Sequence, residues 1–111
     1  MAYRATHRYL LSIKERIEKE YQKPLKISDL AEGAGVSESK LKHEFSAVFG
    51  VNIQEYHVRC RIKAATDLLE NTDHPIKRIA GLVGYKKPES FTRAFSRVTG
   101  ILPSKYRDTL Q

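Results

Sequence analysis

Two segments of this chain carry polar side chains whose types and spacing suit hydrogen bonding to the edges of nucleic-acid bases. In the later segment, the forked guanidinium of Arg93 can donate two bonds to O6 and N7 of guanine, and Glu89 can accept from the amino group of cytosine. Ser90 adds a short hydroxyl that can reach a base or a phosphate. The equivalent candidates of the earlier segment are Ser39, Lys42 and His43. Such chemistry requires helices that hold these side chains outward.

Each candidate also has a purely structural interpretation, which the residues alone leave open. Arg93 can pair with Glu89 four residues earlier, an order that favours ion pairing on a helix. Glu89 can simply orient Arg93, and a carboxylate that faces DNA also rejects wrong sites. Ser90 can satisfy backbone N–H groups at a helix start. Lys42 and His43 can belong to a solvated helix face.

A second set of side chains is suited to contacting phosphates. The chain has 20 Lys and Arg residues against 13 Asp and Glu, and its formal net charge of +7 favours an anionic partner such as nucleic acid or an anionic membrane surface. Membrane binding would need an exposed apolar helix face, and the apolar stripes are all expected to be used in packing. The phosphate-contacting candidates are Lys26, Lys40, Ser46, Lys86, Lys87 and Thr92, with Lys77 and Arg78 as additional cations.

One apolar pattern occurs twice and predicts two similar units. The segment 27–36 recurs as 76–85, 49 positions later, and the segment 41–50 recurs as 91–100, 50 positions later. This difference of one residue predicts an insertion in the second copy around residues 86–88, because a turn tolerates an insertion and a packed helix does not. Two similar units with a fixed spacer suit a target that itself repeats, such as duplex DNA.

Apolar residues at helical spacing predict helices along almost the whole chain, and no segment resembles a strand. Leu10, Ile13 and Ile17 form the stripe of a first helix that ends before Pro24. No apolar run reaches membrane-spanning length, and the N-terminal residues lack the apolar stretch of a signal peptide.

Capping residues predict a helix, a three-residue turn and a helix in the first unit. Ser28 is expected to cap the first of these helices, which ends at Gly35, and Ser37 caps the second. In the second unit, the first helix is expected to end at Gly84 and the following helix to open at Pro88. The remaining helix boundaries are expected at Gly50, Pro75, Gly100 and Pro103.

The segment from residue 53 to about residue 71 predicts one long helix between the units, because it contains no Gly or Pro. At 1.5 Å per residue its length is about 28 Å, close to the ~34 Å between successive major-groove faces of B-DNA. Its reach is short of a full turn, so either the DNA bends or only one unit seats fully. Arg61 on this helix is expected to pair with a carboxylate, Asp108 or Glu55.

Other classes of function are disfavoured. Cys60 is the only cysteine, so no intramolecular disulfide is expected, and a reducing, cytoplasmic compartment is indicated. His57 and Cys60 are three residues apart, a spacing that metals can use, but without further ligands we expect neither a metal nor a cofactor. The chain shows no paired carboxylates, Ser/His/Asp set or glycine-rich phosphate loop, and we therefore expect no enzyme activity.

The spacing of one set of residues resembles the signature of the DNA-binding domain of the AraC/XylS family of bacterial transcription regulators. The set in the second unit comprises Ile79, Ala80, Gly84, Tyr85, Ser90, Phe91, Arg93, Phe95, Gly100, Pro103, Tyr106 and Arg107. The linker adds Arg61, Ile62, Ala65, Leu68 and Leu69. The resemblance covers roughly residues 25–107. It implies an all-α fold of about seven helices, with homeodomain-like helix-turn-helix subdomains at 1–52 and 73–111 joined by a linker helix at 53–72.

The resemblance also implies a function and its partners. We expect sequence-specific binding to double-stranded DNA, with two recognition helices in successive major-groove segments, and no membrane association. RNA polymerase and an N-terminal effector-binding domain are further candidate partners, since relatives occur both free-standing and as the C-terminal part of longer effector-responsive regulators. The alternative is a module that docks RNA polymerase or a sensor domain and has only non-specific DNA affinity.

Overall fold

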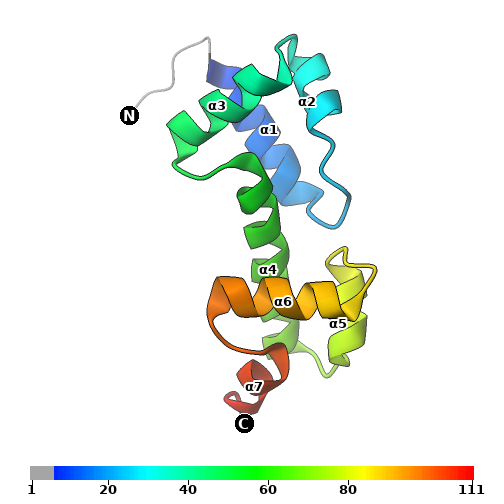
Figure 1. Cartoon of the computed structure of the whole chain (residues 1–111). Helices are drawn as coiled ribbons and strands as arrows, with labels where there is room; N and C mark the ends of the chain where they lie inside the picture. The colour runs from blue at the N-terminus through cyan, green and yellow to red at the C-terminus, as the bar shows by residue number, and fades with distance from the viewer. Residues whose placement is uncertain (1–6) are drawn as a thin grey trace.

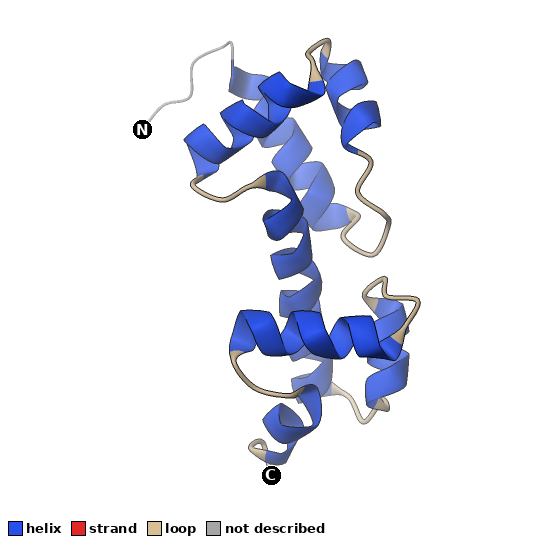
Figure 2. Cartoon of the chain, in the orientation of Figure 1, coloured by secondary structure: helices blue, strands red, loops and turns tan. Residues whose placement is uncertain are grey.

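The structure, a computed structural model, describes residues 7–111, and every regular element in that range is a helix (Figure 2). The all-α prediction is thereby confirmed. Residues 1–6 of the predicted first subdomain lie outside the described range. The seven helices of residues 7–111 are α1 (Arg8–Lys19), α2 (Ile27–Ala34), α3 (Glu38–Phe49), α4 (Ile53–Asn71), α5 (Ile76–Leu82), α6 (Pro88–Thr99) and α7 (Pro103–Asp108).

The long helix α4 joins two lobes, as Figure 1 shows, and the molecule extends over 47 × 29 × 20 Å. Asn52 begins this helix, because its side chain accepts a hydrogen bond from the backbone N–H of Glu55 at 2.8 Å. Helices α1, α2 and α3 lie at one end of α4, and α5, α6 and α7 lie at the other. The long helix predicted from residue 53 to about residue 71 is therefore present.

Each lobe has its own apolar core, and α4 contributes to both. In the first core, the α1 stripe packs against Leu41, Phe45 and the first residue of α4, Ile53. In the second core, Phe91 and Phe95 of α6 pack against residues from the C-terminal part of α4. Both phenylalanines are fully buried, which fixes the side of α6 that faces inward. The two cores position α3 and α6 at opposite ends of one helix.

The turns between the paired helices explain the shift in the repeat. Three residues separate α2 from α3, beginning with Gly35 at φ 71°, and Ser37 caps α3 by accepting from the N–H of Lys40 at 3.1 Å. In the second unit the chain takes one residue more between Gly84 and Pro88 than between the corresponding residues of the first turn. The insertion therefore lies in the turn, as predicted.

Two predicted details at helix starts and ends are wrong. Ser28 does not cap α2, because the helix begins one residue earlier, at Ile27, with Lys26 as its N-cap. Ser28 lies in the first turn and is exposed. Helix α5 ends at Leu82, with Val83 as its C-cap, so Gly84 follows the helix instead of closing it.

The prediction that Arg61 pairs with Asp108 or Glu55 is also wrong. Its Nε donates to the carbonyl oxygen of Tyr21 at 2.7 Å, and its Nη2 donates to that of Lys23 at 3.0 Å. Glu55 instead binds Arg97 and Arg59. Backbone carbonyl oxygens can satisfy a buried guanidinium without a carboxylate, because they present localised negative charge.

In residues 7–111, none of the helices combines the length and apolar character required to cross a membrane.

Candidate nucleic-acid interface

The base-reading candidates of the first unit lie on the outer side of α3. Leu41 and Phe45 are fully buried, so the helix has a fixed orientation against the core. Ser39, Lys42 and His43 are exposed, three and four residues apart, and therefore share one side of the helix. The structure thus presents these three candidates together to solvent.

Helix α6 presents the equivalent positions of the second unit. Glu89 and Arg93 are exposed, one turn apart, while Ser90 is half-buried near the start of the helix. The backbone N–H of Ser90 bonds to the carbonyl of Lys87 at 3.1 Å. In residues 7–111, the Ser90 hydroxyl has no hydrogen-bond partner, which leaves it available as a donor.

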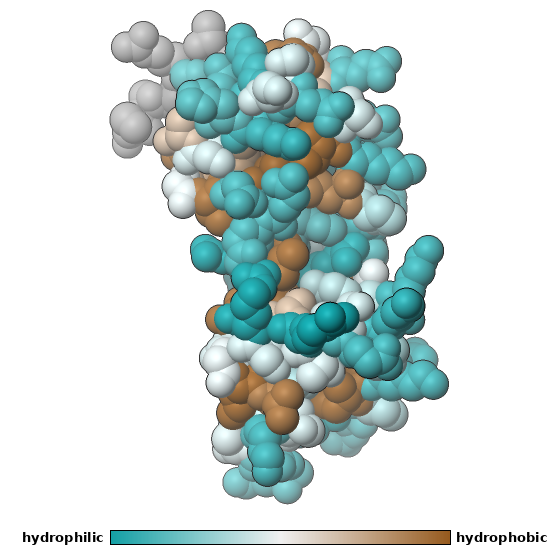
Figure 3. Space-filling model, viewed as in Figure 1, coloured by the Kyte–Doolittle hydropathy of each residue, from teal (hydrophilic) through white to brown (hydrophobic). Residues whose placement is uncertain are grey.

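Helices α3 and α6 both lie toward the viewer in Figure 1. Helix α6 crosses in front of α4, and α3 lies in front of α1. Figure 3 shows that hydrophilic side chains cover most of this side and form a band along α6. A ligand that follows the long axis of α4 can therefore meet both helices at once.

Several exposed cations of α3, α6 and the adjoining loops have no ion pair within residues 7–111. Glu89 and Arg93 form no ion pair with each other, so the structural interpretation of Arg93 lacks its expected contact. Two of the nearby carboxylates are engaged elsewhere, since Glu44 accepts from the hydroxyl of Tyr9 and Glu55 is bound by Arg97. The exposed cations without an ion pair include Lys26, Lys40, Lys42, Lys86, Lys87 and Arg93.

The phosphate-contacting candidates differ in their exposure. Lys26 is the N-cap of α2, Lys87 is the N-cap of α6, and Lys86 precedes it in the turn. These three lysines are exposed, as is Lys40, and they flank the starts of the helices. Ser46 and Thr92 are half-buried, so their hydroxyls have less freedom to reach an external group.

One contact that fixes α6 was not predicted from the sequence. Arg97 donates from Nη1 and Nη2 to the two carboxylate oxygens of Glu55 at 3.1 and 2.9 Å, which ties the last turn of α6 to the first turn of α4. These hydrogen bonds hold the pKa of Glu55 below its usual value. The two residues are 42 positions apart, so only the repeat, by placing both helices, could have indicated their proximity.

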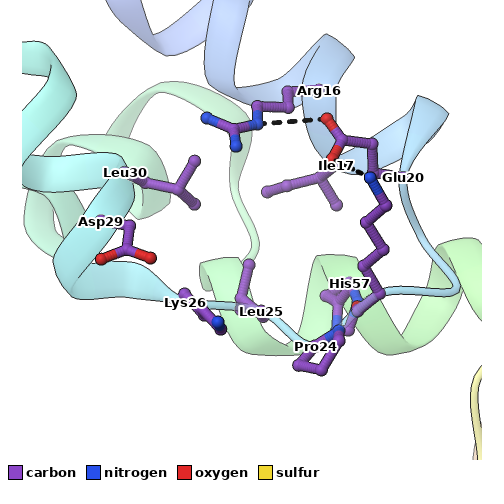
Figure 4. A pocket seen from close by; sticks show the side chains of 10 residues that line it. Arg16, Ile17, Glu20, Pro24, Leu25, Lys26, Asp29, Leu30 and His57 are labelled. Carbon is purple, nitrogen blue, oxygen red and sulfur yellow. Dashed lines mark hydrogen bonds and ion pairs between the residues drawn. The ribbon is translucent and has the colours of Figure 1, made fainter.

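A cavity of about 300 Å³ lies apart from α3 and α6, between α1, the following loop and the start of α2 (Figure 4). Three of its charged residues pair with one another, since Glu20 accepts from Arg16 and from Lys23, each at 3.2 Å. At its edge, Nε2 of His57 lies 2.9 and 3.0 Å from the carbonyl oxygens of Tyr21 and Lys23. This nitrogen therefore carries a proton and is not a metal ligand in this arrangement.

Comparison with known proteins places this geometry in a family. Residues 30–109 match the family described as "Helix-turn-helix domain". The Msm operon regulatory protein of Streptococcus mutans is 32% identical over 107 residues, which cover 96% of this chain and 38% of that protein. An AraC-like transcription regulator of Streptomyces lividans is 38% identical over 81 residues, which cover 73% of this chain and 27% of that protein. This chain thus spans less than two fifths of the length of either relative.

A solved structure agrees with the fold throughout. The C-terminal domain of AraT, a response regulator from Geobacillus stearothermophilus, superimposes with a TM-score of 0.88 at 27% sequence identity, covering 96% of this chain and 88% of that one. The match of residues 30–109, the double helix-turn-helix arrangement and these relatives agree with one another. The chain belongs to the AraC/XylS family and has the fold of its double helix-turn-helix DNA-binding domain.

Proposed function

We propose that this chain binds double-stranded DNA sequence-specifically and regulates transcription, with α3 and α6 as its two recognition helices. The observation that carries the proposal is the pair of helices α3 and α6 along one molecule, whose exposed Lys42 and Arg93 have no ion pair within the described residues. Base edges would be read by Ser39, Lys42 and His43 on α3 and by Glu89, Ser90 and Arg93 on α6. Phosphates would be contacted by Lys26, Lys40, Ser46, Lys86, Lys87 and Thr92.

The two helices would read different sequences. Positions 39, 42 and 43 of α3 correspond to positions 89, 92 and 93 of α6, and every pair differs in residue type. Two unlike half-sites, and not a direct repeat, are therefore the expected target. Because α4 is shorter than one turn of B-DNA, the duplex would bend toward the protein when both helices are seated.

The wider activity follows from the same proposal. The relatives are named as regulatory proteins of operons or of transcription, and this chain corresponds to part of their length. We infer that it acts on DNA in the cytoplasm, by binding and not by catalysis. RNA polymerase and an effector-binding domain are the partners that such an activity would involve.

A gel-shift titration tests the proposal. Duplexes selected by this protein from a random-sequence pool should bind more tightly than scrambled duplexes of the same length and composition. With roughly six phosphate contacts, the slope of log affinity against log salt should be about −5. Equal affinity for selected and scrambled duplexes would instead favour a docking module with only non-specific DNA affinity.

Single substitutions test the assignment of the reading residues. Arg93→Ala should weaken binding by about 1–3 kcal/mol and relax specificity at one base pair, because a bidentate contact to guanine is lost. His43→Ala should change specificity in the other half-site. Lys19→Ala, which removes an exposed charge at the end of α1, is the control and should leave the sequence preference unchanged. An Arg93→Ala protein with the wild-type preference would contradict base reading by this residue.

A further inference from the structure

The two units touch each other at a small cluster around Arg61, halfway along α4. This side chain is 9% exposed, and its guanidinium donates to the carbonyl oxygens of Tyr21 and Lys23, in the loop between α1 and α2. The same guanidinium lies 5.0 Å from the ring centroid of Tyr85, in the turn between α5 and α6. One residue of the linker therefore contacts a loop of the first unit and the helix-turn-helix turn of the second.

Gly84 brings the backbones of the two units into close contact at the same place. Its φ is +107°, and a Cβ atom there would lie 2.5 Å from the carbonyl oxygen of Gln22 and 2.8 Å from Cζ of Arg61. At the equivalent position of the first unit, Gly35, a Cβ atom would have no neighbour within 4 Å. The close contact at Gly84 is thus made by the loop of the first unit and by Arg61, and the equivalent turn of the first unit has no such contact.

Comparison of the two units shows that the contact of Arg61 with the loop is not part of the repeated pattern. In the second unit, Arg107 donates to the carbonyl oxygens of Thr72 and His74. Its counterpart 50 positions earlier, His57, binds two carbonyl oxygens of the corresponding loop, those of Tyr21 and Lys23, and Lys23 is the repeat equivalent of Thr72. The loop of the first unit therefore already has its donor, and Arg61 supplies a second one.

We propose that Arg61 is a positioning residue that fixes the relative orientation of the two helix-turn-helix units and thereby the spacing between the two half-sites that the protein accepts. The DNA part of this inference rests on the proposed function, whereas the orientation part does not. The Glu55–Arg97 ion pair also joins the units, but the Arg97 side chain is more than half exposed, and solvent weakens such pairs. Arg61 is largely buried, and its Nε and Nη2 both donate to backbone oxygens of the first unit.

The orientation is tested without DNA by double electron–electron resonance. In a Cys60→Ser background, spin labels on Glu32→Cys in α2 and Lys105→Cys in α7 report the distance between the units, since both positions are exposed. We expect one narrow distance distribution for the parent and a distribution broader by about twofold for Arg61→Gln, because the cross-unit contact is lost while each core is retained. Arg61→Lys keeps the charge but not the fork and should give an intermediate width.

Arg107→Gln is the matched control. Arg107 also donates to two loop carbonyl oxygens, but within the second unit only, so its loss should leave the distance distribution between the units unchanged. Circular dichroism of every variant confirms that the helices are formed. An Arg61→Gln distribution as narrow as that of the parent would overturn the proposal, because packing on α4 alone would then set the orientation.

The spacing is tested with duplexes selected by the wild-type protein, altered by one or two base pairs between the half-sites. Each added base pair rotates and displaces one half-site, so the wild type should lose about tenfold in affinity, whereas Arg61→Gln should lose less than about threefold. Both proteins should bind an isolated half-site equally. An unchanged spacing profile, or an equal loss on the isolated half-site, would overturn the proposal. If selection yields no motif while the distance distribution broadens, the proposed function fails and the orientation part stands.

Discussion

The free energy of unfolding of Gly84→Ala tests the contact between the two units. The backbone at φ +107° disfavours any side chain, at a cost of about 1–2 kcal/mol. The new Cβ would also lie 2.5 Å from the backbone oxygen of Gln22, which cannot swing aside as a flexible side chain can. Overpacking of this kind costs about 1–3 kcal/mol, so the variant should be destabilised by about 2–5 kcal/mol in total.

Gly35→Ala is the matched control for this prediction. Its backbone is also left-handed, with φ +71°, but the added methyl group would meet nothing within 4 Å. It should cost only the backbone part, about 1–2 kcal/mol. Urea denaturation followed by circular dichroism at 222 nm measures both free energies of unfolding. Equal destabilisation by the two substitutions would refute the argument that Gly84 is required by contact with the first unit.

Two further predictions concern stability alone. Ser37→Ala should destabilise the protein by about 1 kcal/mol in the same denaturation assay, because the N–H of Lys40 loses its partner. Ser39→Ala, which leaves this cap intact, should change stability by less than about 0.5 kcal/mol. A reversed order of the two effects would contradict the capping role of Ser37. Burial, aided by the charge of Arg61, lowers the pKa of His57 below its usual 6.5, so the unfolded chain takes up a proton first and stability should fall as the pH drops below about 6.5. His57→Gln should show a weaker fall between pH 7.5 and 5, and an unchanged pH dependence would exclude His57 as its source.

Helix placement was predictable from the sequence because apolar spacing and caps are local signals. Ser37 and Pro88 begin α3 and α6 as expected, and the turn insertion follows from the shift in the repeat. The prediction that Ser28 caps α2 failed because serine is suited to several positions at a helix start. The backbone hydrogen bond from the N–H of Leu30 to the carbonyl oxygen of Lys26 places the N-cap at Lys26.

The partners of the buried arginine could not be predicted in the same way. Every residue carries a carbonyl oxygen, so no residue type marks Tyr21 and Lys23 as acceptors for Arg61. The exposure of Arg93 was predictable from the burial of Phe91 and Phe95, but the absence of its ion pair with Glu89 depends on side-chain geometry. Which base each exposed side chain meets depends on the duplex and stays a prediction.

Hydroxyl-radical footprinting of the complex on a selected duplex tests the central claim most directly, because it reports where both units lie on DNA. The account predicts two protected patches on one face of the duplex, about one helical turn apart, with Arg93→Ala weakening protection in one patch and His43→Ala in the other. A single protected patch, or protection spread evenly along the duplex, would contradict the claim that α3 and α6 read two half-sites together.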